Sequence, residues 1–239
     1  MSDAPRETRW TWLGRVAYGP TAALQREIRE ALACGEGPER LLLLEHDPVY
    51  TLGRNASAAD VLLPTGELAR AGIEVAETDR GGQVTYHGPG QLVGYPILDL
   101  SPDRRDLRRY VRDLQEVLVA VLGELGIAAR GGEGERIGVW VGERKIASIG
   151  IHLARWRTTH GFALNVDPDL ARFGGIVPCG LPDVTMTSIA RESGRAPGLA
   201  ELGGRVVERF AERFERRLVA DPAFAPVPSA AGGVFGARQ

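Results

Sequence analysis

The order of apolar and polar residues in the first quarter of the chain predicts two strands with a helix between them. Residues 9–18 and the apolar run 41–44 are predicted strands. The intervening helix is predicted from about Pro20 to Ala33 and ends at Gly35, because glycine readily adopts the left-handed conformation that closes helices. Cys34 falls at the end of this helix, and we expect a buried thiol there, since free cysteine is among the most buried residue types.

The next segment predicts two more strands, at 73–78 and 91–98, joined by a polar glycine-rich connection from Arg80 to Gly90. A long amphipathic helix is predicted from Pro102 to Leu125, because apolar residues recur there at the spacing of one helix face.

A hairpin is predicted around Gly142-Glu143, which separates the strand 139–141 from a strand at 146–153. Lys145 then lies at the beginning of the second strand. One further strand is predicted at 162–166, and a helix from about Leu199 to Leu218.

These elements mix strands and helices without a regular alternation, which favours an α+β domain built on a mixed β-sheet with packed helices. We expect a flexible N-terminus at residues 1–8, one domain at 9–219, and a disordered tail rich in Pro, Ala and Gly at 220–239.

Composition supports one globular domain, since 44% of the 239 residues are hydrophobic and 25% are charged. No apolar run is long enough to cross a bilayer, and the first residues lack the apolar segment of a secretory signal. We therefore expect a cytoplasmic protein that binds neither membrane nor nucleic acid.

Lysine is almost absent from the chain. Of the 29 basic residues only Lys145 is a lysine, and the other 28 are arginines. Arginine cannot give up its proton, whereas a partly buried lysine can act as an acid or base. Lys145 is either a functional proton carrier or the remnant of a compositional drift.

Cys179 lies in a segment with two prolines and three glycines, residues 174–182, which neither a helix nor a central strand would accept. A thiol in such a loop is accessible to substrate, but it needs a basic or cationic neighbour to become a strong nucleophile. Lys145 is the candidate neighbour, and a purely structural loop thiol is the alternative. Cys34 and Cys179 show no spacing of a disulfide framework or metal site, so we expect no metal.

The connection from Arg80 to Gln91 contains glycines, hydroxyl groups and His87, a combination that suits the binding of a carbonyl or oxyanion. An ordinary hairpin loop is the alternative. Neither a dinucleotide fingerprint nor a phosphate-binding loop is present, so nucleotide binding is not supported. His46, His152 and His160 are interpreted as structural residues.

Five arginines occur within nine positions of the predicted helix at 102–125. The simpler interpretation is a solvated face whose arginines pair with Asp103, Asp106, Asp113 and Glu116. The alternative interpretation is a docking surface for an acidic partner that uses Arg105 and Arg109. Arg54 and Arg144 are equally available for this role.

Five motifs in a fixed order resemble the octanoyltransferases of lipoate synthesis. They are Glu45-His46-x-Pro48-Val49-Tyr50-Thr51-x-Gly53-Arg54, Arg80-Gly81-Gly82 through Thr85-x-His87-Gly88-x-Gly90-Gln91, Lys145-Ile146-Ala147-Ser148-Ile149-Gly150, His160-Gly161-Phe162-Ala163-Leu164-Asn165 and Gly175-Ile176-x-x-Cys179-Gly180. Together they span residues 45–180, and their combination is much more specific than any one of them.

The resemblance implies a fold like that of the biotin and lipoate protein ligases, with Cys179 as the acyl-thioester residue and Lys145 as its partner. It also implies an acyl-substrate site lined by Arg80, Gly81, Gly82, Gln83, Val84, Thr85, Tyr86, His87, Ser148, Ile149, Gly150, Gly161, Phe162 and Ala163. The implied donor is octanoyl-acyl carrier protein, and the implied acceptors are lipoyl domains of 2-oxoacid dehydrogenase complexes and the glycine cleavage H protein. No cofactor is implied.

Three alternatives stay open at this point. An ATP-dependent lipoate ligase would share the fold without needing the cysteine, a thioesterase would transfer the acyl group to water, and a non-catalytic module would only bind acyl chains or carrier proteins.

Overall fold

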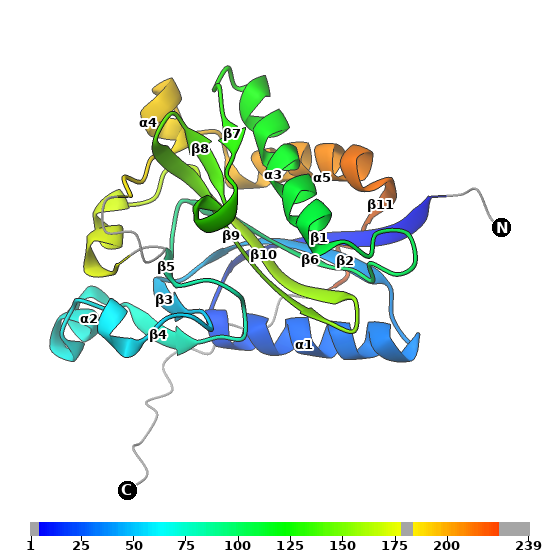
Figure 1. Cartoon of the computed structure of the whole chain (residues 1–239), viewed down its shortest axis with the longest axis horizontal. Coiled ribbons are helices and arrows are strands. Elements are labelled where there is room, and N and C mark those ends of the chain that lie inside the picture. Colours follow the sequence, from blue (N-terminus) through cyan, green and yellow to red (C-terminus); the bar gives the residue numbers. More distant parts are fainter. Residues whose placement is uncertain (1–4, 178–183, 225–239) are drawn as a thin grey trace, which may run out of the picture.

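The computed structural model describes residues 5–177 and 184–224 and is built on an eight-stranded sheet (Figure 1). Its order is β11-β1-β2-β6-β10-β9-β8-β7. The strands are β1 (Arg6–Val16), β2 (Glu39–His46), β6 (Gln91–Ile97), β7 (Arg130–Gly131), β8 (Val139–Val141), β9 (Arg144–Ala154), β10 (Arg157–Asn165) and β11 (Arg216–Ala220). Strand β1 is parallel to β2 and β11, and the other neighbouring pairs are antiparallel. The sheet is therefore mixed, as predicted.

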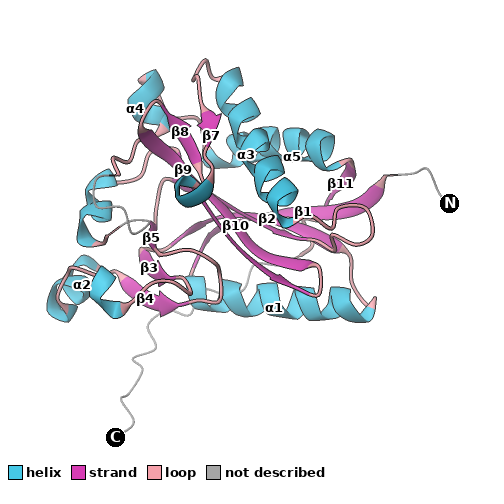
Figure 2. Cartoon of the chain, in the orientation of Figure 1, coloured by secondary structure: helices cyan, strands magenta, loops and turns pink. Residues whose placement is uncertain are grey.

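A second, three-stranded sheet lies beside the N-terminal end of α1 (Figure 2). Its order is β4 (Glu74–Glu77), β3 (Val49–Leu52) and β5 (Val84–His87), with β3 parallel to β4 and antiparallel to β5. The prediction of an uninterrupted connection from Arg80 to Gly90 was wrong, because β5 occupies its middle. The period of two in Val84, Thr85, Tyr86 and His87 is too short to stand out among glycines.

Helices cover both faces of the large sheet (Figure 1). Helix α1 (Tyr18–Cys34) lies on one face, and α3 (Leu107–Glu124) and α5 (Leu199–Phe214) lie together on the other. The shorter helical segments are η1 (Ala58–Asp60), α2 (Thr65–Ala71), η2 (Gly134–Arg136), η3 (Leu170–Gly175) and α4 (Ile189–Ser193). Within the described ranges no helix has both the length and the apolar character that a bilayer crossing requires.

Strand β2 shows why the sheet is buried on both faces. Leu41 and Leu43 pack into the core beneath α3 and α5, whereas Leu42 and Leu44 pack beneath α1. All four side chains are fully buried, and burial of one leucine stabilises the fold by about 1.5–3 kcal/mol. An apolar run without alternation is thus typical of a strand covered by helices on both sides.

The helix boundaries follow from capping residues. Gly35 closes α1 with a φ of 75°, as predicted. Helix α3 begins at Leu107 rather than Pro102, because Asp106 is its N-cap and its side chain accepts a hydrogen bond from Arg109 N.

The predicted helix 199–218 was too long. Helix α5 ends at Phe214, since Glu215 adopts a left-handed φ of 53°. Arg216–Ala220 then forms β11, which pairs in parallel with β1 from Arg6 onward. This pairing also brings residues 6–8, predicted to be flexible, into the sheet.

The expectation of a buried Cys34 was also wrong, because this residue is exposed. The buried residues of α1 are Tyr18, Thr21, Gln25 and Ile28, all in its first three turns. Its last turn therefore carries no contact with the core that would bury a thiol.

Candidate active site

Lys145 is the second residue of β9, and its side chain is buried, with 3% of the residue exposed. Its backbone N–H donates to the Thr185 carbonyl at 2.9 Å, and its carbonyl accepts from Thr187 N at 2.9 Å. Thr185, which contacts Lys145, is only six residues after Cys179 in the sequence.

A glycine makes room for the Lys145 side chain. A Cβ at Gly138 would lie 2.6 Å from Lys145 Cε and 3.3 Å from its Nζ, and Gly138 has a φ of +142°. The ammonium also lies 5.6 Å from the centre of the Trp140 ring. Gln115 in α3 donates to the Gly138 carbonyl at 3.0 Å and holds this glycine in place. The sequence motifs did not reveal this close approach between Gly138 and Lys145.

Cys179 lies in the segment 178–183, outside the described residues, so its pairing with Lys145 remains a prediction. The described chain before it is anchored at Val177, whose N–H donates to the Asp60 carbonyl at 2.9 Å. The chain after it is anchored at Thr185 against Lys145.

Arg80 is buried between the two sheets. It donates to the carbonyl of Thr51 and, at 2.9 Å, to the Thr51 hydroxyl. Its stem lies over Gly150, where a Cβ would come within 3.1 Å of Arg80 Cδ. At Gly53 a Cβ would lie 2.7 Å from an Arg80 nitrogen and 2.3 Å from the Gly82 carbonyl. Two glycines from separate motifs, Gly53 and Gly150, therefore allow one arginine to connect the sheets.

The sequence-predicted substrate residues of β9 and β10 divide between the two faces of the sheet. Ser148 pairs with Ala163, and Gly150 with Gly161, so four small residues lie side by side in adjacent strands. Ala163 belongs to the core on the α1 side. Ile149 and Phe162 instead pack into the core beneath α3 and α5. The small residues are therefore separated from Ile149 and Phe162, and the stem of Arg80 lies against one of them, Gly150.

The same alternation divides β5. Val84 and Tyr86 belong to the core of the small sheet, together with Phe173. Thr85 pairs with Thr51, which binds Arg80, and the His87 ring lies 6.5 Å from the ring of Tyr18 in α1. Thr85 and His87 are thus the β5 side chains nearest the large sheet.

In the turn before β5, some backbone groups already form hydrogen bonds with other segments. Gly81 N–H already donates to the Ile151 carbonyl at 2.8 Å and is therefore not available to stabilise an oxyanion. Gly82 is exposed, with a φ of 90°, and Gln83 accepts from Gly53 N at 3.3 Å.

A buried chain of amides connects His87 to the segment beside Lys145. His87 Nδ1 lies 3.3 Å from Gln91 Oε1, and Gln91 Nε2 donates to Asn165 Oδ1 at 2.9 Å. Asn165 Nδ2 in turn donates to the Thr187 carbonyl at 2.9 Å. Gln91 and Asn165 end two of the sequence motifs, but only the fold shows that they meet.

Burial keeps the two central histidines neutral. It lowers the pKa of His46 to about 4, and it lowers the pKa of His87 well below its usual value, with help from His46 and Arg80. His46 Nδ1 faces the Val16 carbonyl at 2.9 Å and therefore donates, so Nε2 accepts from the Tyr95 hydroxyl at 2.8 Å. The prediction that His46 is structural agrees with these contacts.

His160 and His152 converge on Asp79. His160 Nε2 lies 2.7 Å and His152 Nε2 lies 3.7 Å from the carboxylate. The hydrogen bond from His160 is the main cause that lowers the pKa of Asp79. This cluster fixes the residue directly before Arg80.

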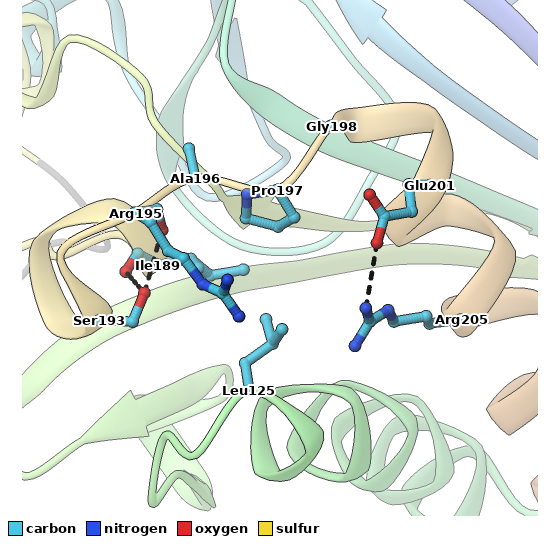
Figure 3. Close-up of a pocket in the computed structure, with 9 residues that line it drawn as sticks. All are labelled: Leu125, Ile189, Ser193, Arg195, Ala196, Pro197, Gly198, Glu201 and Arg205. Atoms are coloured by element: carbon cyan, nitrogen blue, oxygen red, sulfur yellow. Dashed lines mark hydrogen bonds and ion pairs between the residues drawn. The ribbon is translucent and has the colours of Figure 1, made fainter.

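Two of the cavities in the described part of the chain are lined by helical residues. One, of about 410 Å³, lies between α1 and β10. The other, of about 330 Å³, is lined by Leu125, the α4–α5 connection and α5, where Arg205 pairs with Glu201 (Figure 3). None of the sequence-predicted site residues lines either cavity.

Residues 18–211 match the model of the lipoyl protein ligase A/B catalytic domain. The chain belongs to this family. It is 50% identical over 203 residues to the octanoyltransferase of Solibacter usitatus, covering 85% of this chain and 91% of that protein. It is 49% identical over 216 residues to the octanoyltransferase of Myxococcus xanthus, covering 88% of this chain and 60% of that longer protein.

Solved structures titled as lipoate and biotin protein ligases share the fold at low identity. Lipoate-protein ligase A bound with ATP superposes with a TM-score of 0.73 at 20% identity, over 90% of this chain and 89% of that one. The protein Ta0514 from T. acidophilum with bound lipoic acid gives 0.72 at 20% identity, over 90% and 89%. A biotin protein ligase from Aquifex aeolicus with biotin and ATP gives 0.54 at 16% identity, over 87% and 70%. The expected biotin and lipoate ligase-like fold is confirmed.

Proposed function

We infer that this chain is an octanoyltransferase of lipoate biosynthesis that carries the acyl group on Cys179. The observation that supports this most is the identity of about half of its residues with the octanoyltransferase of Solibacter usitatus over most of both chains. The buried Lys145, held by Thr185 and Thr187, gives the proposal its chemistry.

The first step is transfer from a carrier thioester to Cys179. The thiolate attacks the thioester carbonyl, the bond to the carrier thiol breaks, and the departing thiolate takes up the proton that Cys179 lost. Lys145 is the proposed carrier of that proton. One thioester replaces another, so the step needs no activated nucleotide.

The second step forms the amide. The amine of the target lysine attacks the acyl-Cys179 carbonyl, the C–S bond breaks, and the amine loses a proton as the thiolate leaves. Lys145 receives that proton in the proposal. It is suited to this role because a buried lysine can exchange its proton, as arginine cannot.

The octanoyl chain is proposed to lie over the small residues on the α1 side of β9 and β10. Ser148 and Ala163 carry only short side chains there, and the stem of Arg80 lies over Gly150 beside them. Removal of the chain from water is worth about 0.8 kcal/mol per methylene. This is enough to hold eight carbons in a fitted site.

Octanoyl-acyl carrier protein is the proposed donor. Lipoyl domains of 2-oxoacid dehydrogenase complexes and the glycine cleavage H protein are the proposed acceptors, and the cytosol is the proposed location. The competing function is an ATP-dependent ligase of the same fold, which would activate a free acid and need no cysteine.

Mass spectrometry of the intact protein tests this function. After exposure to octanoyl carrier protein without ATP, we expect a mass increase of one octanoyl group, mapped by proteolysis to Cys179 and discharged by a lipoyl domain. Lys145→Arg should slow both loading and discharge by at least about a hundredfold, because general acid–base catalysis typically contributes that much.

The control is Cys34→Ser, which should acylate normally because Cys34 is an exposed thiol on α1. Cys179→Ser that still transfers octanoyl groups, or transfer that requires ATP, would overturn the proposal in favour of the ligase.

A further inference from the structure

Asn165, the last residue of β10, forms hydrogen bonds with two other segments of the chain. It is 1% exposed, and it pairs across the sheet with Gln91, the first residue of β6. Its Oδ1 accepts from Gln91 Nε2 at 2.9 Å, and its Nδ2 donates to the Thr187 carbonyl at 2.9 Å. An amide can form both bonds, because it carries an acceptor and a donor side by side.

The segment that Asn165 binds lies alongside Lys145. The Lys145 carbonyl accepts from Thr187 N, and Lys145 N donates to the Thr185 carbonyl, each at 2.9 Å. Met186, between the two threonines, forms a parallel bridge with Lys145. Residues 185–187 therefore follow the start of β9, and Asn165 holds the end of this segment.

The bond from Asn165 is difficult to replace. Thr187 is 0% exposed, so water would not take over as the donor to its carbonyl. A buried carbonyl without a donor is unfavourable, and we expect the segment to move until the carbonyl finds another one. Residues 185–187 are only six to eight positions after Cys179 in the sequence. A movement of this segment would therefore change the path of the chain that leads from Cys179 to Lys145.

We propose that Asn165 is a positioning residue that keeps Lys145 and Cys179 together for octanoyl transfer. The inference rests on the proposed chemistry of Cys179 and adds a residue to it. In this role Asn165 contacts neither the substrate nor the reacting atoms. Its effect should therefore appear in the ionisation of the Cys179 thiol and in the rate of acyl loading, and not in the affinity for the acyl donor.

Two substitutions of Asn165 separate its donor group from its shape. Asn165→Asp keeps the size and an acceptor for Gln91, but an ionised carboxylate cannot donate to the Thr187 carbonyl. Protonation restores a donor, so the loading rate of this variant relative to the parent should rise as the pH falls through the pKa of the new carboxyl, which burial raises. Asn165→Leu lacks both groups, and its relative rate should stay low at every pH.

Alkylation of Cys179 by iodoacetamide is the second measurement. It is followed against pH in a Cys34→Ser background, because Cys34 is an exposed thiol. In the parent we expect the pKa of Cys179 below the ordinary value of about 8.5, since Lys145 favours the thiolate. Asn165→Leu should raise it by about one pH unit. Single-turnover loading from octanoyl-pantetheine should fall at least about tenfold, while the donor concentration for half-maximal loading stays unchanged.

Thr158→Val is the matched control. Thr158 is buried in the same strand, and its hydroxyl donates to the Pro96 carbonyl at 2.8 Å and accepts from Leu98 N at 2.9 Å. The substitution therefore removes two buried hydrogen bonds that do not involve residues 185–187. We expect a lower melting temperature, with the pKa of Cys179 and the loading rate unchanged.

Two results would overturn the positioning role and leave octanoyl transfer intact. One is an unchanged thiol pKa and loading rate in the folded Asn165 variants, and the other is an equal change in Thr158→Val. If neither Asn165 variant folds, Gln91→Leu carries the same expectation, because it removes the bond that orients the Asn165 amide. A parent protein that forms no acyl adduct on Cys179 would instead overturn the proposed function together with this inference.

Discussion

A glycine, Gly138, makes room for the side chain of Lys145, the single lysine of the sequence. Lys145 is buried, and its methylene stem occupies the space that a side chain at Gly138 would need. Arg80 relies on Gly53 and Gly150 in the same way. These positions require glycine, because any side chain there would occupy the space that the cationic side chain now fills.

Replacement of Gly138 tests this requirement. In Gly138→Ala the new methyl would lie 2.6 Å from both Lys145 Cε and the Ala147 carbonyl oxygen, in a backbone with a φ of +142°. We expect octanoyl transfer to fall at least about tenfold, because small misplacement of a catalytic group is costly. Stability should fall by about 1–3 kcal/mol. Single-turnover kinetics and urea unfolding measure the two effects.

Gly142→Ala is the control for backbone strain alone. Gly142 lies in the same hairpin with a φ of +56°, and a Cβ there meets nothing within 4 Å. It should cost about 1 kcal/mol of stability and leave the transfer rate near that of the parent. Similar rates in the two variants would show that Gly138 does not position Lys145.

At the scale of elements, the last described strand, β11, completes the sheet. Strand β11 adds to the outer side of β1 after Glu215 ends α5. Its first residue, Arg216, donates to Glu39 of β2 at 2.9 Å, across the intervening β1. Glu39 also accepts from Thr8 at 3.0 Å and from Arg6. One buried carboxylate therefore connects three strands.

Removal of the Arg216 side chain should strongly lower the stability of the contact between β11, β1 and β2. Arg216→Ala leaves Glu39 buried with only part of its hydrogen bonding, and a broken buried ion pair costs about 3–5 kcal/mol. Because Arg6 remains, we expect a loss near 3 kcal/mol in urea unfolding. Arg217→Ala is the matched control, since Arg217 has 62% of its side chain exposed in its pair with Glu7 and should change stability by less than about 0.5 kcal/mol. Equal losses would argue that β11 is not fixed by the buried pair.

For the whole molecule, the sequence motifs grouped residues by their order along the chain and did not predict on which face of the sheet the fold places each of them. Contiguous runs such as Ser148-Ile149-Gly150 were assigned to the acyl site together. Strand alternation sends Ile149 to the opposite core and leaves its neighbours facing α1. The bonds from Gln91 to Asn165 and from Asn165 to Thr187 join distant segments. The pattern of residues within one segment does not predict such contacts, because they depend on which strands are neighbours in the sheet.

The sheet also places the candidate docks for the proposed acidic carrier protein at different distances from Lys145. The arginines before and within α3 were predicted to form a solvated face paired with local acids. Arg104 does pair with Asp113, one of those acids, but it is buried. Asp103 instead pairs with Arg6 and Arg216. Arg105 is exposed but lies 6.0 Å from the Trp156 ring, beyond the far end of β9. Lys145 is at the other end of that strand, about 30 Å away along its length.

Arg144 is better placed, because it directly precedes Lys145 and is exposed in its pair with Glu192. We expect Arg144→Gln to lower kcat/KM for octanoyl carrier protein about threefold to tenfold at low salt and to flatten its salt dependence, since rim charges act mainly on association. Turnover of octanoyl-pantetheine should stay near that of the parent, which separates docking from damage to the neighbouring Lys145. Arg105→Gln is the matched control and should change neither. If Arg105→Gln lowered kcat/KM for the carrier protein alone, the docking surface would instead lie at the start of α3. The carrier-bound acyl group would then have to reach Lys145 along the whole length of β9.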